Sequence, residues 1–138
     1  MVWLFEAMYE YNLALRFQDI VERYPQRVSL WFNERESYTY LDLNCRANQM
    51  ARLLFQHGLA SGDVVCISGL KNIHTFSLML ACLKIGVVYS IFDPDSPPER
   101  LRKIFSTCRP RLVAADAELL QKMRSIFAEL LIDSFNTD

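Results

Sequence analysis

After residue 40 the sequence alternates between segments with helical periodicity and short apolar runs, and this alternation limits the possible folds more than any other feature. The apolar runs cover residues 64–68, 87–92 and 111–115, and each has the length of a buried strand. Helical segments separate them. This order is typical of an α/β fold in which helices cover both faces of an open, mainly parallel sheet.

Polar residues that favour helix caps mark the expected starts of the helical segments. Such residues include Asn12, Thr39 with Asp42, Asn72 and Asp116. Thr39 and Asp42 have the spacing of a capping pair, in which each side chain bonds the backbone of the other residue. The first three helices are expected to end at Pro25, Gly58 and Gly86.

Apolar residues recur every three or four positions in the first two helices. In the first helix they are Leu13, Phe17, Ile20, Val21 and Tyr24, and in the second Leu43, Ala47, Met50 and Leu54. The helix over 73–85 is apolar on almost every side, which places it inside a larger body. A short β-hairpin is predicted between the first two helices, with strands at 27–33 and 37–40 joined across 34–36.

The segment after the second buried run, Asp93-Pro-Asp-Ser-Pro-Pro-Glu, changes abruptly from apolar to polar. Its last four residues match a capping box, so Ser96 and Glu99 are predicted to satisfy each other's backbone N–H groups. Pro97 would occupy the first helical position, where its missing N–H is harmless. The following helix has an apolar face formed by Leu101, Ile104, Phe105 and Cys108.

Two carboxylates, Asp93 and Asp95, are the first candidates for chemistry. They follow a predicted parallel strand, where open α/β sheets bind ligands, and a D-x-D pair can hold a divalent cation. The same residues also suit a turn that leads into a helix. We favour the turn, because nothing else in the sequence converges on the pair.

A cluster of basic residues is the second candidate. It consists of Arg100, Arg102, Lys103, Arg109 and Arg111, in a chain whose net charge is −1. Phosphate binding is one interpretation, and a solvated helix face is the other. We favour the solvated face, because neither a glycine-rich loop nor interleaved aromatic residues accompany the cluster. His57 and His74 lie too far apart in sequence for a metal-binding pair, and we assign no catalytic, cofactor-binding or metal residue.

The four cysteines are Cys45, Cys66, Cys82 and Cys108. Their spacing matches neither a zinc site nor a C-x-x-C motif, so we interpret them as buried thiols in a reducing, cytoplasmic setting. Glu6 and Glu10 interrupt the N-terminal apolar residues, which argues against a signal peptide. Residues 73–92 are long enough to span a membrane, but Gly86 divides them and favours a buried helix followed by a buried strand.

The end of the chain carries a long apolar stripe at helical spacing. Its members are Leu119, Leu120, Met123, Ile126, Phe127, Leu130, Leu131 and Phe135. Two interpretations remain open. The stripe either packs on its own sheet, which we favour, or forms an exposed patch through which the chain self-associates.

Two segments resemble the N-terminal part of the adenylate-forming, or AMP-binding, synthetases and ligases. The first is Tyr38-Thr-Tyr-Leu-Asp-Leu43, and the second is Leu83-Lys-Ile-Gly-Val-Val-Tyr-Ser-Ile-Phe-Asp-Pro94. The second segment, with the following Pro-Pro-Glu-Arg-Leu, is most similar to nonribosomal peptide synthetase adenylation domains. The resemblance extends from about Asn12 to Asp116. Ile91 stands where the family usually has Pro, and Ser96 where it usually has Tyr.

The resemblance implies an enzyme that uses Mg-ATP to convert a carboxylate, expected to be an amino acid, into an acyl-adenylate and then into a thioester. The family's phosphate-binding loop and catalytic lysine lie downstream, so residues 1–138 are expected to be one partial domain, inactive alone. Expected partners are the rest of the domain and a phosphopantetheine carrier, with neither nucleic acid nor membrane. The alternative is a non-catalytic interaction module that dimerises or complements another chain through the helix at 119–135. A flavodoxin-like or receiver-like domain is disfavoured, because Asp63 precedes its strand.

Overall fold

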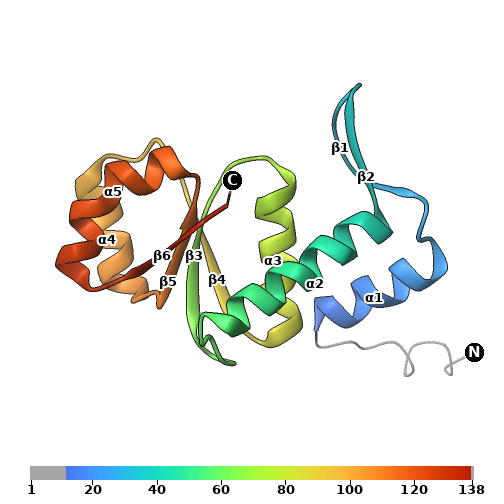
Figure 1. The fold of residues 1–138 in the computed structure, drawn as a ribbon, viewed down its shortest axis with the longest axis horizontal. Helices are drawn as coiled ribbons and strands as arrows, with labels where there is room; N and C mark the ends of the chain where they lie inside the picture. Colours follow the sequence, from blue (N-terminus) through green and yellow to red (C-terminus); the bar gives the residue numbers. More distant parts are fainter. Residues whose placement is uncertain (1–11, 138) are drawn as a thin grey trace, which may run out of the picture.

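A parallel sheet of four strands forms the centre of the molecule in the computed structural model, which describes residues 12–137 (Figure 1). The strands lie in the order β4–β3–β5–β6. Their bounds are Val64–Ser68 for β3, Val88–Phe92 for β4, Leu112–Ala115 for β5 and Asp133–Asn136 for β6. All three pairings are parallel, which confirms the predicted α/β fold.

Within residues 12–137, five helices and a hairpin accompany this sheet. The helices are α1 (Leu13–Arg23), α2 (Tyr40–Gln56), α3 (Ile73–Ile85), α4 (Pro98–Cys108) and α5 (Ala117–Leu130). Helices α4 and α5 cover one face of the sheet, and α2 and α3 lie on the other side (Figure 1). The antiparallel hairpin of β1 (Val28–Asn33) and β2 (Glu36–Thr39) projects beyond α2, away from the sheet (Figure 1).

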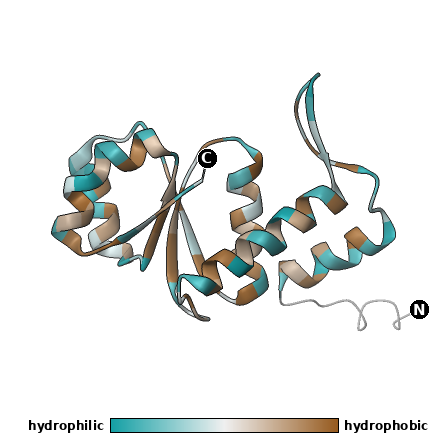
Figure 2. Ribbon diagram, viewed as in Figure 1, coloured by the Kyte–Doolittle hydropathy of each residue, from teal (hydrophilic) through white to brown (hydrophobic). Residues whose placement is uncertain are grey.

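The hydrophobic core has two halves, because successive residues of a strand point to opposite faces of the sheet. Hydrophobic residues run along the central strands (Figure 2). On the side of α2 and α3, the half-core contains Val65, Ile67, Leu112 and Ala114 from the sheet, with Leu54 and Leu78 from the helices. On the side of α4 and α5, it contains Cys66, Phe92, Val113 and Ala115, with Leu101, Phe105, Met123 and Phe127.

The predicted caps are confirmed at four helices. The side chains of Asn12, Thr39, Asn72 and Asp116 each accept a hydrogen bond from a backbone N–H in the first turn of α1, α2, α3 and α5, respectively. At α2 the capping box is complete, because the Asp42 carboxylate also accepts the Thr39 N–H at 2.9 Å. Gly86 closes α3 in the left-handed conformation, with φ of 73°.

Replacing Thr39 with alanine should lower the free energy of unfolding by about 1 kcal/mol at neutral pH. The hydrogen bonds from Thr39 hold the pKa of Asp42 below its ordinary value. The alanine variant keeps the bond from the Thr39 N–H and loses the bond from the Thr39 hydroxyl to the Asp42 carboxylate. The contribution of that lost bond is present above the ordinary carboxyl range and disappears as the pH falls through the lowered pKa of Asp42. Urea unfolding of both proteins at neutral and at strongly acidic pH measures this. An equal difference at both pH values would contradict the assignment.

The predicted capping box at Ser96 is wrong. Helix α4 begins at Pro98, its cap residue is Pro97, and no side chain bonds the helix start. The N–H of Ser96 instead donates to the carbonyl of Asp93 at 3.1 Å, within the preceding turn. The Glu99 carboxylate accepts a hydrogen bond from Arg102 at 2.7 Å and does not reach back. The backbone N–H of Ser96, which the capping box required, is therefore already bonded to Asp93 in this turn.

The final apolar stripe is also only partly helical. Helix α5 ends at Leu130, and Leu131 adopts the left-handed conformation with φ of 55°, so Phe135 belongs to strand β6 instead. Sequence reasoning missed this strand. Within the stripe, the side chains of Leu119, Met123, Ile126 and Phe127 are buried in the α4–α5 half of the core. This is the favoured interpretation, in which the helix packs on its own sheet.

Several residues predicted to be buried are exposed, including Val88 and Ile91 of the second apolar run and Leu131 of the final stripe. Leu13 is 68% exposed and Tyr24 is 44% exposed, because the buried face of α1 runs through Ala14 and Val21 instead. Cys45 is exposed, since the buried side of α2 is formed by its neighbours Leu43, Asn44 and Ala47.

None of the helices within residues 12–137 has the length and hydrophobicity needed to cross a membrane. The candidate segment 73–92 is divided into α3 and β4, as predicted. The signal-peptide prediction concerns residues that lie outside the described part of the chain.

Candidate functional site

The C-terminal edge of the parallel sheet is the place where an open α/β fold can bind a ligand. In the strand register, Ser68 lies beside Phe92, and Ala115 lies beside Asn136. The residues that leave the sheet at this edge are Gly69, Asp93, Asp116 and Thr137. Helices α3, α4 and α5 each begin shortly after one of these exits, so three helix N-termini lie along the same edge.

The two candidate carboxylates lie in the exit turn of β4. Both are exposed, and the Asp93 carboxylate accepts the N–H of Asp95 at 3.0 Å. Residues 12–137 bring no third acidic, histidine or cysteine side chain to them, and they contain no group of three that could hold a metal ion. The geometry fits the turn interpretation of this motif.

The exits of β3 and β4 are held tightly together. The N–H of Gly69 donates to the carbonyl of Phe92 at 2.8 Å. A Cβ atom at position 69 would lie 3.0 Å from that same carbonyl oxygen and 3.1 Å from the side chain of Ile91. A side chain here would therefore force the two closely approaching backbones to shift by a few tenths of an ångström.

Ser68, the last residue of β3, carries a polar group without a partner. Its side chain faces the same side of the sheet as Cys66, and the residue is only 3% exposed. Its hydroxyl oxygen is the one buried side-chain oxygen or nitrogen among residues 12–137 that makes no hydrogen bond. A buried hydroxyl in this state is destabilising, and sequence reasoning gave no indication of it.

Replacing Ser68 with alanine should raise the free energy of unfolding by about 1 kcal/mol, because the variant no longer buries an unpaired hydroxyl. Ser77→Ala is the matched control, since the buried Ser77 hydroxyl donates to the carbonyl of Ile73 at 2.7 Å. That variant should lose stability. Urea unfolding of the three proteins measures both effects. A loss in Ser68→Ala equal to that in Ser77→Ala would mean that the Ser68 hydroxyl has a partner.

The basic cluster is partly neutralised by acidic neighbours. Arg102 donates to Glu129 at 3.1 Å and to Glu99 at 2.7 Å, and hydrogen bonding to Glu129 raises the pKa of its guanidinium. Arg111 pairs with Asp63 at 3.1 Å. Exposed pairs of this kind contribute little to stability, and they fit the solvated-face interpretation better than a phosphate site.

Lys84 occupies an unusual position among α1, α2 and α3. Its ammonium group donates to the side-chain oxygen of Asn44 at 2.8 Å and to that of Gln18 at 3.4 Å. Neither acceptor carries a negative charge, and burial lowers the pKa of Lys84. This lysine therefore joins three helices through amide groups. Sequence reasoning missed the junction, because its members lie far apart in the chain.

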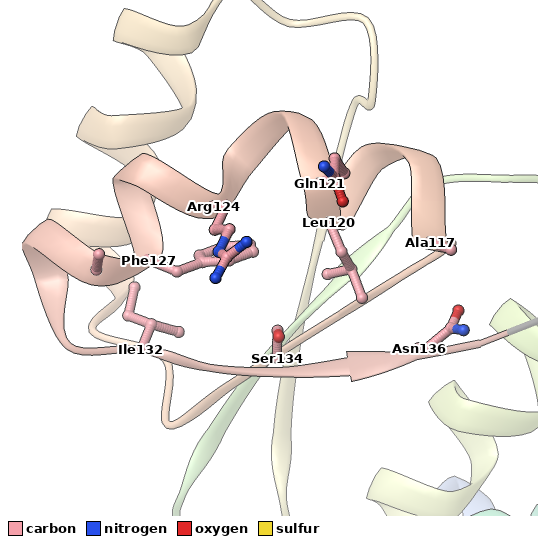
Figure 3. Close-up of a pocket in the computed structure, with 9 residues that line it drawn as sticks. Ala117, Leu120, Gln121, Arg124, Phe127, Ile132, Ser134 and Asn136 are labelled. Atoms are coloured by element: carbon pink, nitrogen blue, oxygen red, sulfur yellow. The ribbon is translucent and has the colours of Figure 1, made fainter.

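A pocket of about 470 Å³ lies between α5 and β6 (Figure 3). Leu120 and Ile132 extend into the space between the helix and the strand, and Gln121 and Arg124 add polar groups (Figure 3). None of the residues that sequence analysis weighed for ligand binding lines it. The pocket depends on β6, the strand that sequence reasoning missed.

The AMP-binding enzyme family matches residues 17–136, which include every strand and most of every helix described above. The chain belongs to the AMP-binding enzyme family. The resemblance seen in the two sequence motifs is thereby confirmed for nearly the whole chain.

Relatives within the AMP-binding enzymes include nonribosomal peptide synthetases. The chain is 34% identical over 99 residues to nonribosomal peptide synthetase 2 of Cochliobolus heterostrophus, a match that covers 72% of this chain and 2% of that protein. It is 30% identical over 122 residues to gramicidin S synthase 1 of Brevibacillus brevis, covering 88% of this chain and 11% of that protein. The chain thus spans a small part of the curated relatives that it matches.

The fold agrees with that of a solved N-terminal subdomain. The N-terminal subdomain of NpsA from Klebsiella oxytoca superposes with a TM-score of 0.72 and 28% identity, covering 77% of this chain and 28% of that one. In the present structure the two sequence motifs of this family, residues 38–43 and 83–94, have structural roles. The first forms the capping box of α2, and the second forms the end of α3, strand β4 and its exit turn.

Proposed function

We propose that this chain is the N-terminal part of an adenylation domain that activates an amino acid with ATP, giving an acyl-adenylate for transfer to a thiol. The observation that carries the proposal is the family match over residues 17–136, together with the peptide synthetases among its relatives. The small share of those relatives that the chain covers supports the further proposal that it is inactive alone.

The chemistry of this reaction requires donors and a cation around the α-phosphate of ATP. The described residues do not fit a magnesium site, and the motif side chains of Thr39 and Asp42 are engaged with each other and with the backbone. We therefore assign ATP, magnesium and any phosphopantetheine arm to contacts with the remainder of the enzyme. The role proposed for residues 12–137 is to build the sheet against which that remainder packs.

A chimera tests the proposal. In gramicidin S synthase 1, the segment that matches this chain is replaced by the corresponding residues of this chain. Amino-acid-dependent exchange between ATP and pyrophosphate is then measured. Exchange with the amino acid of the host enzyme should be retained. A folded, monodisperse chimera without exchange would contradict the proposal. The 138-residue chain alone should give no exchange above the blank, and exchange by it would contradict the proposed inactivity.

The rest of the adenylation domain and a carrier protein are the proposed partners, in the cytoplasm. Dimerisation through the helix at 119–135 has weaker support, because Leu119, Met123, Ile126 and Phe127 are already buried in the molecule's own core. Sedimentation of the chain over a range of concentrations tests the dimerisation alternative. Self-association through the helix at 119–135 would produce a dimer whose fraction rises with concentration.

A further inference from the structure

The amine of Lys84 lies at the junction of three helices and is surrounded by neutral groups. Lys84 belongs to the last turn of α3 and is half-buried. Its Nζ donates to the side-chain oxygen of Asn44 on α2 at 2.8 Å, and to that of Gln18 on α1 at 3.4 Å. Asn44 is itself only 8% exposed. Within residues 12–137, no carboxylate forms an ion pair with Lys84.

The acidic residues of α1 are engaged elsewhere. Asp19 pairs with Arg16 at 3.5 Å and with Arg23 at 3.0 Å. Glu22 accepts a hydrogen bond from the side-chain nitrogen of Gln18 at 3.4 Å. The two carboxylates of this helix therefore leave the amine of Lys84 to its amide partners.

Two neutral acceptors match the uncharged form of an amine. The ammonium form of lysine has three N–H donors, whereas the uncharged form has two N–H donors and a lone pair. The oxygens of Asn44 and Gln18 satisfy both donors of the uncharged form, so Lys84 can lose its third proton without losing a hydrogen bond to the protein. Burial lowers the pKa of Lys84, which favours the same form.

We propose that Lys84 is a site of acylation, at which the uncharged amine takes an acyl group from a thioester. The proposal rests on the two amide acceptors that hold the amine and on the absence of a paired carboxylate among the described residues. It goes beyond the proposed adenylation function and does not depend on it.

The transfer is the aminolysis of a thioester. The lone pair of Nζ attacks the carbonyl carbon, and a C–N bond forms as the carbonyl oxygen takes a negative charge. The carbonyl then re-forms as the C–S bond breaks, and the leaving thiolate takes one proton from the nitrogen. The products are an amide and a thiol, and neither an oxidant nor a reductant is required.

Acylation should loosen the attachment of α1. The nitrogen of an acylated lysine keeps one N–H, so it can donate to only one of its two acceptors. If the shorter bond to Asn44 is kept, Gln18 loses its link to α3. The side chain of Asn12, which donates to the carbonyl of Leu83 at 3.2 Å, then remains as a polar link between the two helices. Backbone amides of α1 should exchange hydrogen faster in the acylated chain, and unchanged exchange would overturn this consequence.

The test treats the 138-residue chain at mildly alkaline pH with S-phenyl thioacetate, a small and uncharged thioester. A thiol then removes acetyl groups from cysteines, and peptide mass spectrometry follows the acetylation of each lysine. Lys84 should react at least about threefold faster than Lys71, Lys103 and Lys122. Exposure alone predicts the opposite order, because those three lysines are exposed. Acetylation of Lys84 no faster than that of the exposed lysines would overturn the proposal.

Variants decide whether the neutral acceptors are responsible. Asn44→Asp places a carboxylate beside the Nζ of Lys84, which stabilises the ammonium form and should slow its acetylation about tenfold. Gln18→Glu makes the same change from α1 and replaces the first variant if circular dichroism shows that Asn44→Asp is unfolded. Glu118→Gln is the matched reverse case. It removes the carboxylate that lies 2.6 Å from the Nζ of Lys122 and raises the pKa of that lysine, so Lys122 should react faster. A folded Asn44→Asp or Gln18→Glu chain whose Lys84 reacts as fast as in the parent would overturn the proposal.

Discussion

Replacing Phe105 with alanine should lower the free energy of unfolding by about 3–5 kcal/mol. The ring is only 1% exposed and lies where α4 meets both the sheet and α5. It packs edge-on against Phe92 with 5.4 Å between ring centroids, and at 6.1 Å from the ring of Phe127. The substitution removes both contacts and leaves a cavity between the sheet, α4 and α5.

Guanidinium unfolding followed by circular dichroism measures this loss. Phe55→Ala is the matched control, because the same side chain at position 55 is 74% exposed on α2. The control should change the free energy of unfolding by less than about 0.5 kcal/mol. Similar losses at the two positions would show that the α4–α5 half-core is not packed as described.

Replacing Gly86 with alanine should lower the free energy of unfolding by about 2–4 kcal/mol. The loss has two sources, the left-handed backbone at this position and a steric clash. Gly86 has φ of 73°, and a Cβ atom there would lie 2.6 Å from the hydroxyl oxygen of Ser61. The backbone at this position is held from both sides, because the carbonyl of Gly86 also accepts the N–H of Gly62 at 2.9 Å. Rotation of the Ser61 side chain can move its hydroxyl away, but its Cβ atom would still lie 3.2 Å from the new methyl group, so the turn must also shift.

Two further variants separate the contributions. Gly62 has φ of 90° but open space around its Cβ position, so Gly62→Ala should cost only about 1–2 kcal/mol, from backbone strain. In a Ser61→Gly background, Gly86→Ala should lose part of its penalty, because the clashing hydroxyl is absent. Urea unfolding of these variants and of the parent chain measures each change in the free energy of unfolding. Equal costs at positions 62 and 86 would rule out the clash.

Local features of the sequence predicted the fold well where neighbouring residues determine the structure. Thr39 and Asp42 lie three positions apart, and their side chains bond the backbone of the same turn, so the start of α2 was correctly predicted. Gly86 likewise ended α3 as expected. The alternation of apolar runs and helices gave the parallel sheet, because parallel neighbours require crossovers of this kind.

Features that depend on distant contacts could not be predicted. Ser96 matched a capping pattern, but the turn at Asp93 had already bound its N–H. Strand β6 has four residues and follows the helix closely, so Phe135 fell by coincidence on the helical spacing. In the strand, its ring packs against His57 at 5.6 Å between centroids. The contacts of Lys84 join helices that only the folded chain brings together.

The strand order β4–β3–β5–β6 also has a consequence for the chain as it leaves the ribosome. Strand β3 is synthesised first, β4 then adds on one side of it, β5 on the other, and β6 beyond β5. Each strand thus finds its pairing partner already made, and no gap has to stay open for a later segment. Domains generally fold during synthesis from the N-terminal end. This sheet can therefore grow outward from its centre at the pace of translation.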